Sequence, residues 1–168
     1  MPSQFTIRPA RPADRSAVTQ VLRRSYPSLL APDYAPVLLR AVLPHITTAQ
    51  PALLGCGTYF VAEDAMGRIV GVGGWTDVSP ARGVTAKRQG HMRHVATVPG
   101  VLRQGVARRL VEASVASARG FGMERLHCMS TRTAEAFYRA MGFAPYGEIE
   151  LTLAPGVYFP TVQMQRGL

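Results

Sequence analysis

The chain is organised around Thr97-Val-Pro-Gly-Val-Leu-Arg-Gln-Gly-Val-Ala-Arg-Arg-Leu110. An apolar run, Val95 to Val98, predicts a strand that stops at Pro99-Gly100, and a strongly patterned helix begins at Gly105. Small residues at such a turn let a ligand approach the backbone, and the first N–H groups of a helix have no internal partners. Three arginines, at positions 103, 108 and 109, place positive charge at the same end. We interpret the stretch as a pyrophosphate site.

Length and composition favour one globular domain spanning residues 1–168. The longest apolar runs are too short to span a bilayer, and the first residues lack the apolar stretch of a signal peptide. The two cysteines, Cys56 and Cys128, form no Cys-x-x-Cys pair. This pattern fits a reducing compartment, so we expect a cytoplasmic protein with no membrane partner.

The net charge of +9, from 19 Lys and Arg against 10 Asp and Glu, favours anionic partners. These charges do not gather into a lysine-rich tail, and aromatic residues do not alternate with arginines along any strand. A phosphorylated cofactor therefore fits this charge better than nucleic acid does.

Hydrophobic periodicity divides the rest of the chain into short strands and amphipathic helices. The predicted strands span residues 4–8, 59–63, 68–77, 91–98, 125–129, 149–153 and 161–165. The predicted helices span residues 12–26, 33–45, 105–119 and a segment from Thr131 or Thr133 to Met141; residues 50–57 and 79–88 are predicted loops. A meander of three strands before a strand–helix–strand unit predicts an α/β (α+β) fold. We expect a three-layer arrangement, with a mixed, mostly antiparallel sheet of about seven strands and helices on both faces.

This order of elements, the Leu102-Arg-Gln-Gly-Val-Ala107 turn and the segment Ala134-Glu-Ala-Phe-Tyr-Arg-Ala-Met-Gly-Phe143 together resemble the GNAT superfamily of acetyl-CoA-dependent N-acetyltransferases. The opening Ile7-Arg-Pro-Ala-Arg-Pro-Ala-Asp14 is also similar to the usual start of these proteins. The resemblance covers almost the whole chain. It implies acetyl-CoA as co-substrate and transfer of an acetyl group to a primary amine by direct attack in a ternary complex. The acceptor, a small molecule or a peptide or protein amine, cannot be read from the sequence.

The resemblance also implies which residues hold the coenzyme. Gly105 and Ala107 match the small positions of the family's phosphate loop, whereas Leu102 stands where Arg or Gln is usual. Backbone N–H groups from position 103 to position 108 would cradle the pyrophosphate, and a strand upstream would pair with the pantetheine arm. The implied coenzyme-binding residues are Ala96, Thr97, Val98, Arg103, Gln104, Gly105, Val106, Ala107 and Arg108.

By the same resemblance, Tyr138 lies at the family's position for a tyrosine near the coenzyme sulfur. An amine that attacks a thioester expels a thiolate, and a phenol positioned by a helix can protonate it as a general acid. A backbone N–H of the Val95–Thr97 strand would polarise the thioester carbonyl. The structural alternative for Tyr138 is a core aromatic residue with a hydrogen-bonded hydroxyl.

The amine must lose a proton before it attacks, and the candidate bases are Glu63, His91 and His94. We favour His94 because a histidine titrates near neutral pH. Cys128 follows His127 directly, but neighbouring strand residues face opposite ways, so the two do not form a convincing dyad. The four histidines lack a metal-ligand spacing, and no metal is expected.

Two other functions stay open at this point. One is a non-catalytic domain that binds or senses acyl-CoA, and the other is a basic nucleic-acid-binding protein that shares the fold. Acceptor specificity is expected to depend on the two N-terminal helices, the loop at 79–88 and the closing strand pair. A homodimer is also open.

Overall fold

The computed structural model describes residues 4–168, so the first three residues of the expected 1–168 domain lie outside the described part. The strands are β1 (Phe5–Pro9), β2 (Tyr59–Asp64), β3 (Ile69–Thr76), β4 (Gln89–Thr97), β5 (Arg125–Ser130), β6 (Ala144–Ala154) and β7 (Val157–Gly167). The helices are α1 (Arg15–Leu30), α2 (Pro36–Ile46), α3 (Pro51–Leu54), α4 (Val106–Gly120) and α5 (Glu135–Ala140), with short 3-10 turns at Pro12–Asp14 and Pro99–Val101.

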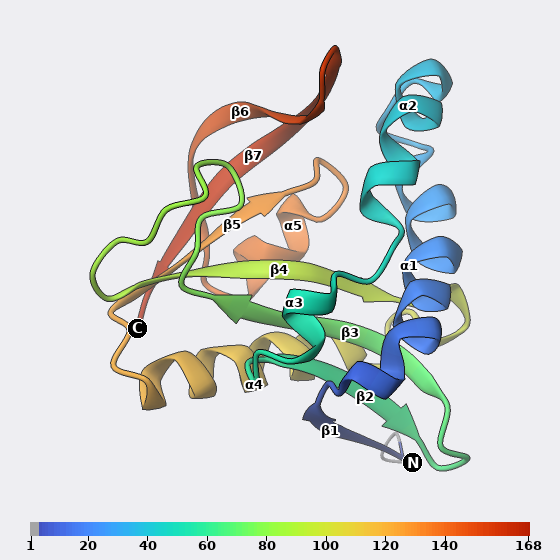
Figure 1. Cartoon of the computed structure of the whole chain (residues 1–168), viewed down its shortest axis with the longest axis vertical. Helices are drawn as coiled ribbons and strands as arrows, with labels where there is room; N and C mark the ends of the chain where they lie inside the picture. The colour runs from blue at the N-terminus through green and yellow to red at the C-terminus, as the bar shows by residue number, and fades with distance from the viewer. Residues whose placement is uncertain (1–3) are drawn as a thin grey trace.

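The strands form one seven-stranded sheet in the order β1-β2-β3-β4-β5-β7-β6 (Figure 1). Within it β4 and β5 pair in parallel, because α4 carries the chain back between them, and the other described neighbours pair antiparallel. The expectation of a mixed, mostly antiparallel sheet of about seven strands is therefore confirmed.

Helices cover both faces of this sheet (Figure 1). On β3, a Cβ added to Gly71 would lie 2.6 Å from Val106 Cγ1 of α4, so glycine allows α4 to pack directly on the strand. Val70 and Val72 face the opposite side, because successive strand residues alternate. They belong to the same buried cluster as Val21 of α1. The close packing on β3 is the physical reason for its run of small residues, which the sequence already assigned to a strand.

Prolines lie inside α1 and α2, although the sequence predicted that Pro27 and Pro44 would end these helices. A proline near the last turn removes one backbone hydrogen bond but still permits helical geometry after it. Leu30 and Ile46, which follow the two prolines, are buried in one cluster. Their burial offsets the lost hydrogen bonds, so the helices continue.

Three other segments are more regular than predicted. The expected loop at 50–57 contains α3, whose Leu53 and Leu54 are buried. The closing strands β6 and β7 have 11 residues each and rise as a long hairpin beside α2 (Figure 1). Phe159 of β7 packs into the cluster that includes residues of α1 and α2, so this hairpin forms a wall facing the N-terminal helices.

The two parallel strands separate after a short contact. Their register pairs His91 of β4 with His127 of β5, and the two residues before each are paired in the same way. Further along β4 the pairing with β3 shifts between Val72 and Gly74, where His94 has a positive φ of 37°. Two β4 residues there oppose one on β3, which defines a β-bulge that bends the strand. The bend and the short pairing leave an opening in the middle of the sheet.

Among residues 4–168, no helix is long and apolar enough to cross a membrane.

Candidate active site

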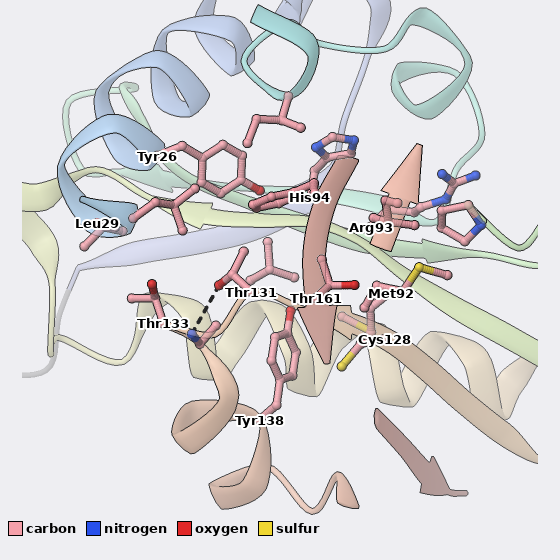
Figure 2. Close-up of a pocket in the computed structure, with 18 of the residues that line it drawn as sticks. Tyr26, Leu29, Met92, Arg93, His94, Cys128, Thr131, Thr133, Tyr138 and Thr161 are labelled. Atoms are coloured by element: carbon pink, nitrogen blue, oxygen red, sulfur yellow. Dashed lines mark hydrogen bonds between the residues drawn. The ribbon is translucent and has the colours of Figure 1, made fainter. Parts of the chain in front are cut away.

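A cleft with a cavity volume of about 190 Å³, partly open to solvent, lies where β4 and β5 separate. Its walls come from α1, α2, the two strands, the chain leading into α5 and the β6–β7 hairpin (Figure 2). The polar side chains that line it, among the described residues, are Ser25, Tyr26, Arg93, His94, Cys128, Thr131, Thr133, Tyr138 and Thr161, without any Asp or Glu. The remainder of the wall is mainly apolar, so a ligand here meets few polar groups.

The loop between β4 and α4 presents free backbone N–H groups. The N–H groups of residues 101, 102 and 104 donate to carbonyls within the loop, and that of Arg109 donates to Gly105 O. Within residues 4–168, the N–H groups of residues 103 and 105–108 have no acceptor in the loop or the first turn of α4. Gly105 has a φ of +80°, and no atom lies within 4 Å of a Cβ built on it, so its surface is open. The loop therefore offers an anion several unpaired donors at the positive end of a helix.

The arginines around this loop differ in their availability. Arg103 has a positive φ of 63° and is exposed, and Arg108 makes a long contact of 3.9 Å with Glu112. Arg109, which the sequence grouped with them, instead donates to Phe5 O at 2.9 Å and stacks over the Phe5 ring. Arg109 thus ties α4 to β1 and is not a free cation beside the loop.

The end of β4 has one backbone edge toward β3 and one toward the opening. Val98 N–H donates to Val70 O at 2.9 Å, and Val98 O accepts from Val101 N–H, so both polar groups of Val98 are already bonded. Ala96 is paired with Val72, two residues along from the Val98–Val70 pair, so its N–H and C=O groups also face β3. Because these groups alternate along a strand, those of Val95 and Thr97 face the opening. Of the three predicted pantetheine-contacting residues, Thr97 is thus the one whose backbone faces the gap.

Tyr138 enters the cleft from α5, and its hydroxyl points into the space (Figure 2). The ring is 7% exposed and packs edge-to-face on Phe137 and Phe143, at centroid distances of 5.2 and 5.4 Å. Gly142 has the left-handed φ of +88° that a helix C-cap requires, and Phe143, which follows it, packs on Tyr138. Among the described residues the hydroxyl has no hydrogen-bond partner. Burial raises the pKa of Tyr138 well above its usual value, so the phenol is protonated at neutral pH.

The chain entering α5 is held by a local hydrogen bond. Thr131 Oγ1 accepts from Ala134 N–H at 3.2 Å, as the dashed line in Figure 2 shows, and the helix then begins at Glu135. Thr131 was one of two predicted capping residues, and its hydroxyl caps the turn that leads into the helix. This contact helps to fix the direction of α5 and with it the position of Tyr138.

His94 lies in the cleft wall, but its chemistry differs from the expectation. The side-chain amide nitrogen of Gln50 can only donate, so Nε2 of His94, 2.9 Å away, accepts and is occupied. Burial, aided by the charge of Arg93, lowers the pKa of His94 to about 4. A low pKa makes the ring a weak proton acceptor, so the near-neutral pKa that favoured His94 in the sequence does not fit this environment.

The other candidate bases lie elsewhere. Glu63 accepts from Arg8 at 2.7 Å and is not part of the cleft wall. His91 stacks on His127 with ring centroids 5.1 Å apart, and burial together with the charge of His127 lowers its pKa to about 4. Burial raises the pKa of the Cys128 thiol, so a nucleophilic thiolate is not favoured there. No group of metal-ligating residues occurs within residues 4–168.

Several cleft residues were missed by sequence reasoning. Tyr26 and Leu29 enter from α1, Arg93 from β4, and Leu151 and Phe159 from the hairpin. These positions are far apart in the chain and carry no local motif, so their meeting depends on how α1 and the hairpin fold over the sheet. The β-bulge that directs this part of β4 also had no signal in the local pattern.

Comparisons with known proteins agree with this fold. The family model described as an acetyltransferase (GNAT) domain matches residues 55–145, whereas the search of curated proteins gives no match.

A GCN5-related N-acetyltransferase from Rhodopseudomonas palustris is similar in structure, with a TM-score of 0.80, 19% identity and coverage of 100% of this chain and 98% of that chain. The PaiA N-acetyltransferase from Thermoplasma acidophilum, solved in complex with coenzyme A, has a TM-score of 0.74 at 12% identity and covers 98% and 99% of the two chains. A phosphinothricin acetyltransferase from Sinorhizobium meliloti, in complex with acetyl-CoA, has a TM-score of 0.65 at 21% identity, with coverage of 98% and 89%. The matched domain spans more than half of the sequence and includes β4, the loop between β4 and α4, and Tyr138. The chain belongs to the GNAT acetyltransferase family.

Proposed function

We propose that this protein is an acetyl-CoA-dependent N-acetyltransferase that transfers an acetyl group to a primary amine by direct attack in a ternary complex. One observation carries the proposal: a protonated phenol without a protein partner, Tyr138, points into a cleft at the opening between β4 and β5. Tyr26 of α1 also lines the cleft without a hydrogen-bond partner among the described residues, so what distinguishes Tyr138 is its place on α5, at the position that the family resemblance implies.

The residues present fit acetyl-CoA, which supplies the activated acetyl group. The unpaired N–H groups of residues 103 and 105–108 would hold its diphosphate, with Gln104 in the same loop and the side chain of Arg103 adding positive charge. The backbone edge of Val95 and Thr97 would bind the pantetheine amides, as a β-strand binds a partner strand.

Tyr138 and the β4 backbone would then serve the chemistry. Tyr138 Oη keeps its proton at neutral pH and would donate it to the departing thiolate. A backbone N–H in the Val95–Thr97 segment would polarise the acyl carbonyl in a site shielded from water. The largely apolar walls of the cleft offer bound water few hydrogen-bond partners.

The amine must arrive without its proton. Because His94 has a pKa of about 4 and a bonded Nε2, we do not assign it the role of a strong base. The amine would instead bind from the small deprotonated fraction in solution, with His94 shaping the wall at the β-bulge. This predicts a rate that rises with pH until the free amine is deprotonated.

The coenzyme site is tested by a pair of substitutions at Gly105. Asn and Asp both tolerate a left-handed conformation and have nearly the same size, so Gly105→Asn is a matched control for Gly105→Asp. Both side chains can cap free N–H groups of the loop, but the carboxylate also repels a diphosphate. We expect Gly105→Asp to weaken coenzyme A binding by about 10-fold or more relative to Gly105→Asn in a calorimetric titration.

Catalysis is tested separately by thiol release from acetyl-CoA with a panel of amines. Release that depends on an amine supports the transferase. Tight coenzyme binding without release for any amine would favour the non-catalytic acyl-CoA-binding alternative. Equal coenzyme affinities for the two Gly105 variants would contradict the phosphate loop assignment.

A further inference from the structure

The acceptor end of the cleft combines an apolar wall with one side chain of permanent charge. Leu29, Ile46, Leu151 and Phe159 line it from α1, α2 and the β6–β7 hairpin, beside the phenol of Tyr26. Within the described residues, no Asp or Glu lines the cleft. A polyamine, whose remote ammonium groups need carboxylate partners, therefore has no matching site here.

Arg93 is the charged residue of this wall. It lies on β4 opposite Gly74, just before the β-bulge, and it is half-buried. Its Nε donates to Thr76 Oγ1 at 3.0 Å, which holds the plane of the guanidinium. Within residues 4–168, neither terminal nitrogen has a hydrogen-bond acceptor, and no carboxylate lies within 4 Å of the group.

A guanidinium that is partly buried without a partner of opposite charge costs desolvation free energy. Burial lowers the pKa of Arg93, and its charge contributes to the lowered pKa values of His91 and His94 beside it. These neighbours are therefore neutral and do not add a second cation to compete for an anion. An anionic group on a ligand would compensate the charge of Arg93 and accept two charge-assisted hydrogen bonds from its terminal nitrogens.

The diphosphate does not need this arginine, because the loop that would hold it follows the C-terminal end of β4, and Arg93 lies in the middle of that strand. The anion that meets Arg93 must therefore come from the acceptor. A planar carboxylate matches two parallel guanidinium N–H groups, and an apolar body matches the remaining wall.

We propose that the acceptor is a small amino carboxylate with an apolar side chain, bound through its carboxylate to Arg93. The inference depends on the proposed transferase function for its biological meaning, but the binding can be measured without turnover. A peptide N-terminus differs from this ligand because its first residue carries no free carboxylate.

The test uses the full chain saturated with coenzyme A, which has no acetyl group to transfer. Binding of phenylalanine, leucine and methionine is compared by calorimetry with binding of their amides and their decarboxylated amines. We expect each acid to bind at least about 10-fold more tightly than its two neutral analogues. In Arg93→Gln this preference should disappear, and in Arg93→Lys part of it should remain.

Arg82→Gln is the matched control, because Arg82 is exposed on the neighbouring loop and does not line the cleft. This control should keep the full preference, and coenzyme A affinity and the thermal midpoint show whether each variant is folded. The inference is overturned if none of the three acids binds, if the neutral analogues bind as well, or if Arg93→Gln weakens acids and amines equally. A carboxylate preference without any turnover in the thiol-release assay would support this inference and refute the transferase.

Discussion

Replacement of Tyr138 by Phe removes one hydroxyl from the cleft and little else. The ring would keep its edge-to-face contacts with Phe137 and Phe143, at 5.2 and 5.4 Å. The hydroxyl has no partner among the described residues, so the substitution breaks no protein hydrogen bond. We therefore expect the free energy of unfolding to change by less than about 0.5 kcal/mol.

The effect on turnover should be much larger. A positioned general acid contributes roughly 10²- to 10⁴-fold to a rate, which corresponds to about 3–5 kcal/mol of transition-state stabilisation. Steady-state thiol release should show this loss in kcat, while the dissociation constant of acetyl-CoA stays within about twofold of the wild-type value.

Tyr34 provides the control with the opposite behaviour. It is also buried, but its hydroxyl donates to Pro160 O at 2.9 Å and accepts from Arg132 N–H at 2.9 Å. Tyr34→Phe should lower the free energy of unfolding by about 1–3 kcal/mol, because it leaves buried groups unpaired, without a comparable loss in kcat. Unchanged kcat in Tyr138→Phe, with the protein folded, would refute the acid assignment.

Two other predictions concern the loop and the bulge. Leu102 is 42% exposed, so the arginine of Leu102→Arg should attract the diphosphate through solvent and raise the affinity for coenzyme A about two- to fivefold, less at high salt. An unchanged affinity at low salt would contradict the assignment of this loop to the diphosphate. The pKa of His94 is lowered to about 4 in the folded state, so the unfolded chain binds more protons below pH 6.5 and stability falls as the pH drops toward 4. Asn tolerates the positive φ, so between pH 7 and pH 4.5 the free energy of unfolding of His94→Asn should fall by about 2 kcal/mol less than that of the wild type in denaturant unfolding. His91 would account for part of the pH dependence that remains. Parallel pH profiles for the two proteins would exclude this role for His94.

The fold could be predicted largely because its signals are local. The small residues of β3, the glycine before α4 and the cap at Gly142 each impose a backbone geometry that a short pattern reveals. The ends of elements were less predictable. Pro27 and Pro44 lie inside helices because buried residues beyond them stabilise another turn, and that burial depends on the distant hairpin.

The candidate site likewise contains residues that local motifs reveal and residues whose role depends on the folded surroundings. The phosphate loop and Tyr138 were predicted from contiguous motifs and a family resemblance; Tyr138 lines the cleft, and the loop with unpaired N–H groups follows β4. Arg93 was missed because a single arginine in a strand forms no recognisable motif. It stands out only in the folded structure, where no carboxylate among the described residues pairs with it. His94 was misjudged because its low pKa is a property of burial and of Arg93, neither of which the sequence shows.

A crystal structure of the protein with coenzyme A tests the central claim most directly. The account predicts that the diphosphate lies on the N–H groups of residues 103–108 and that the sulfur lies within hydrogen-bonding distance of Tyr138 Oη. A diphosphate bound elsewhere, or a sulfur remote from that hydroxyl, would contradict it.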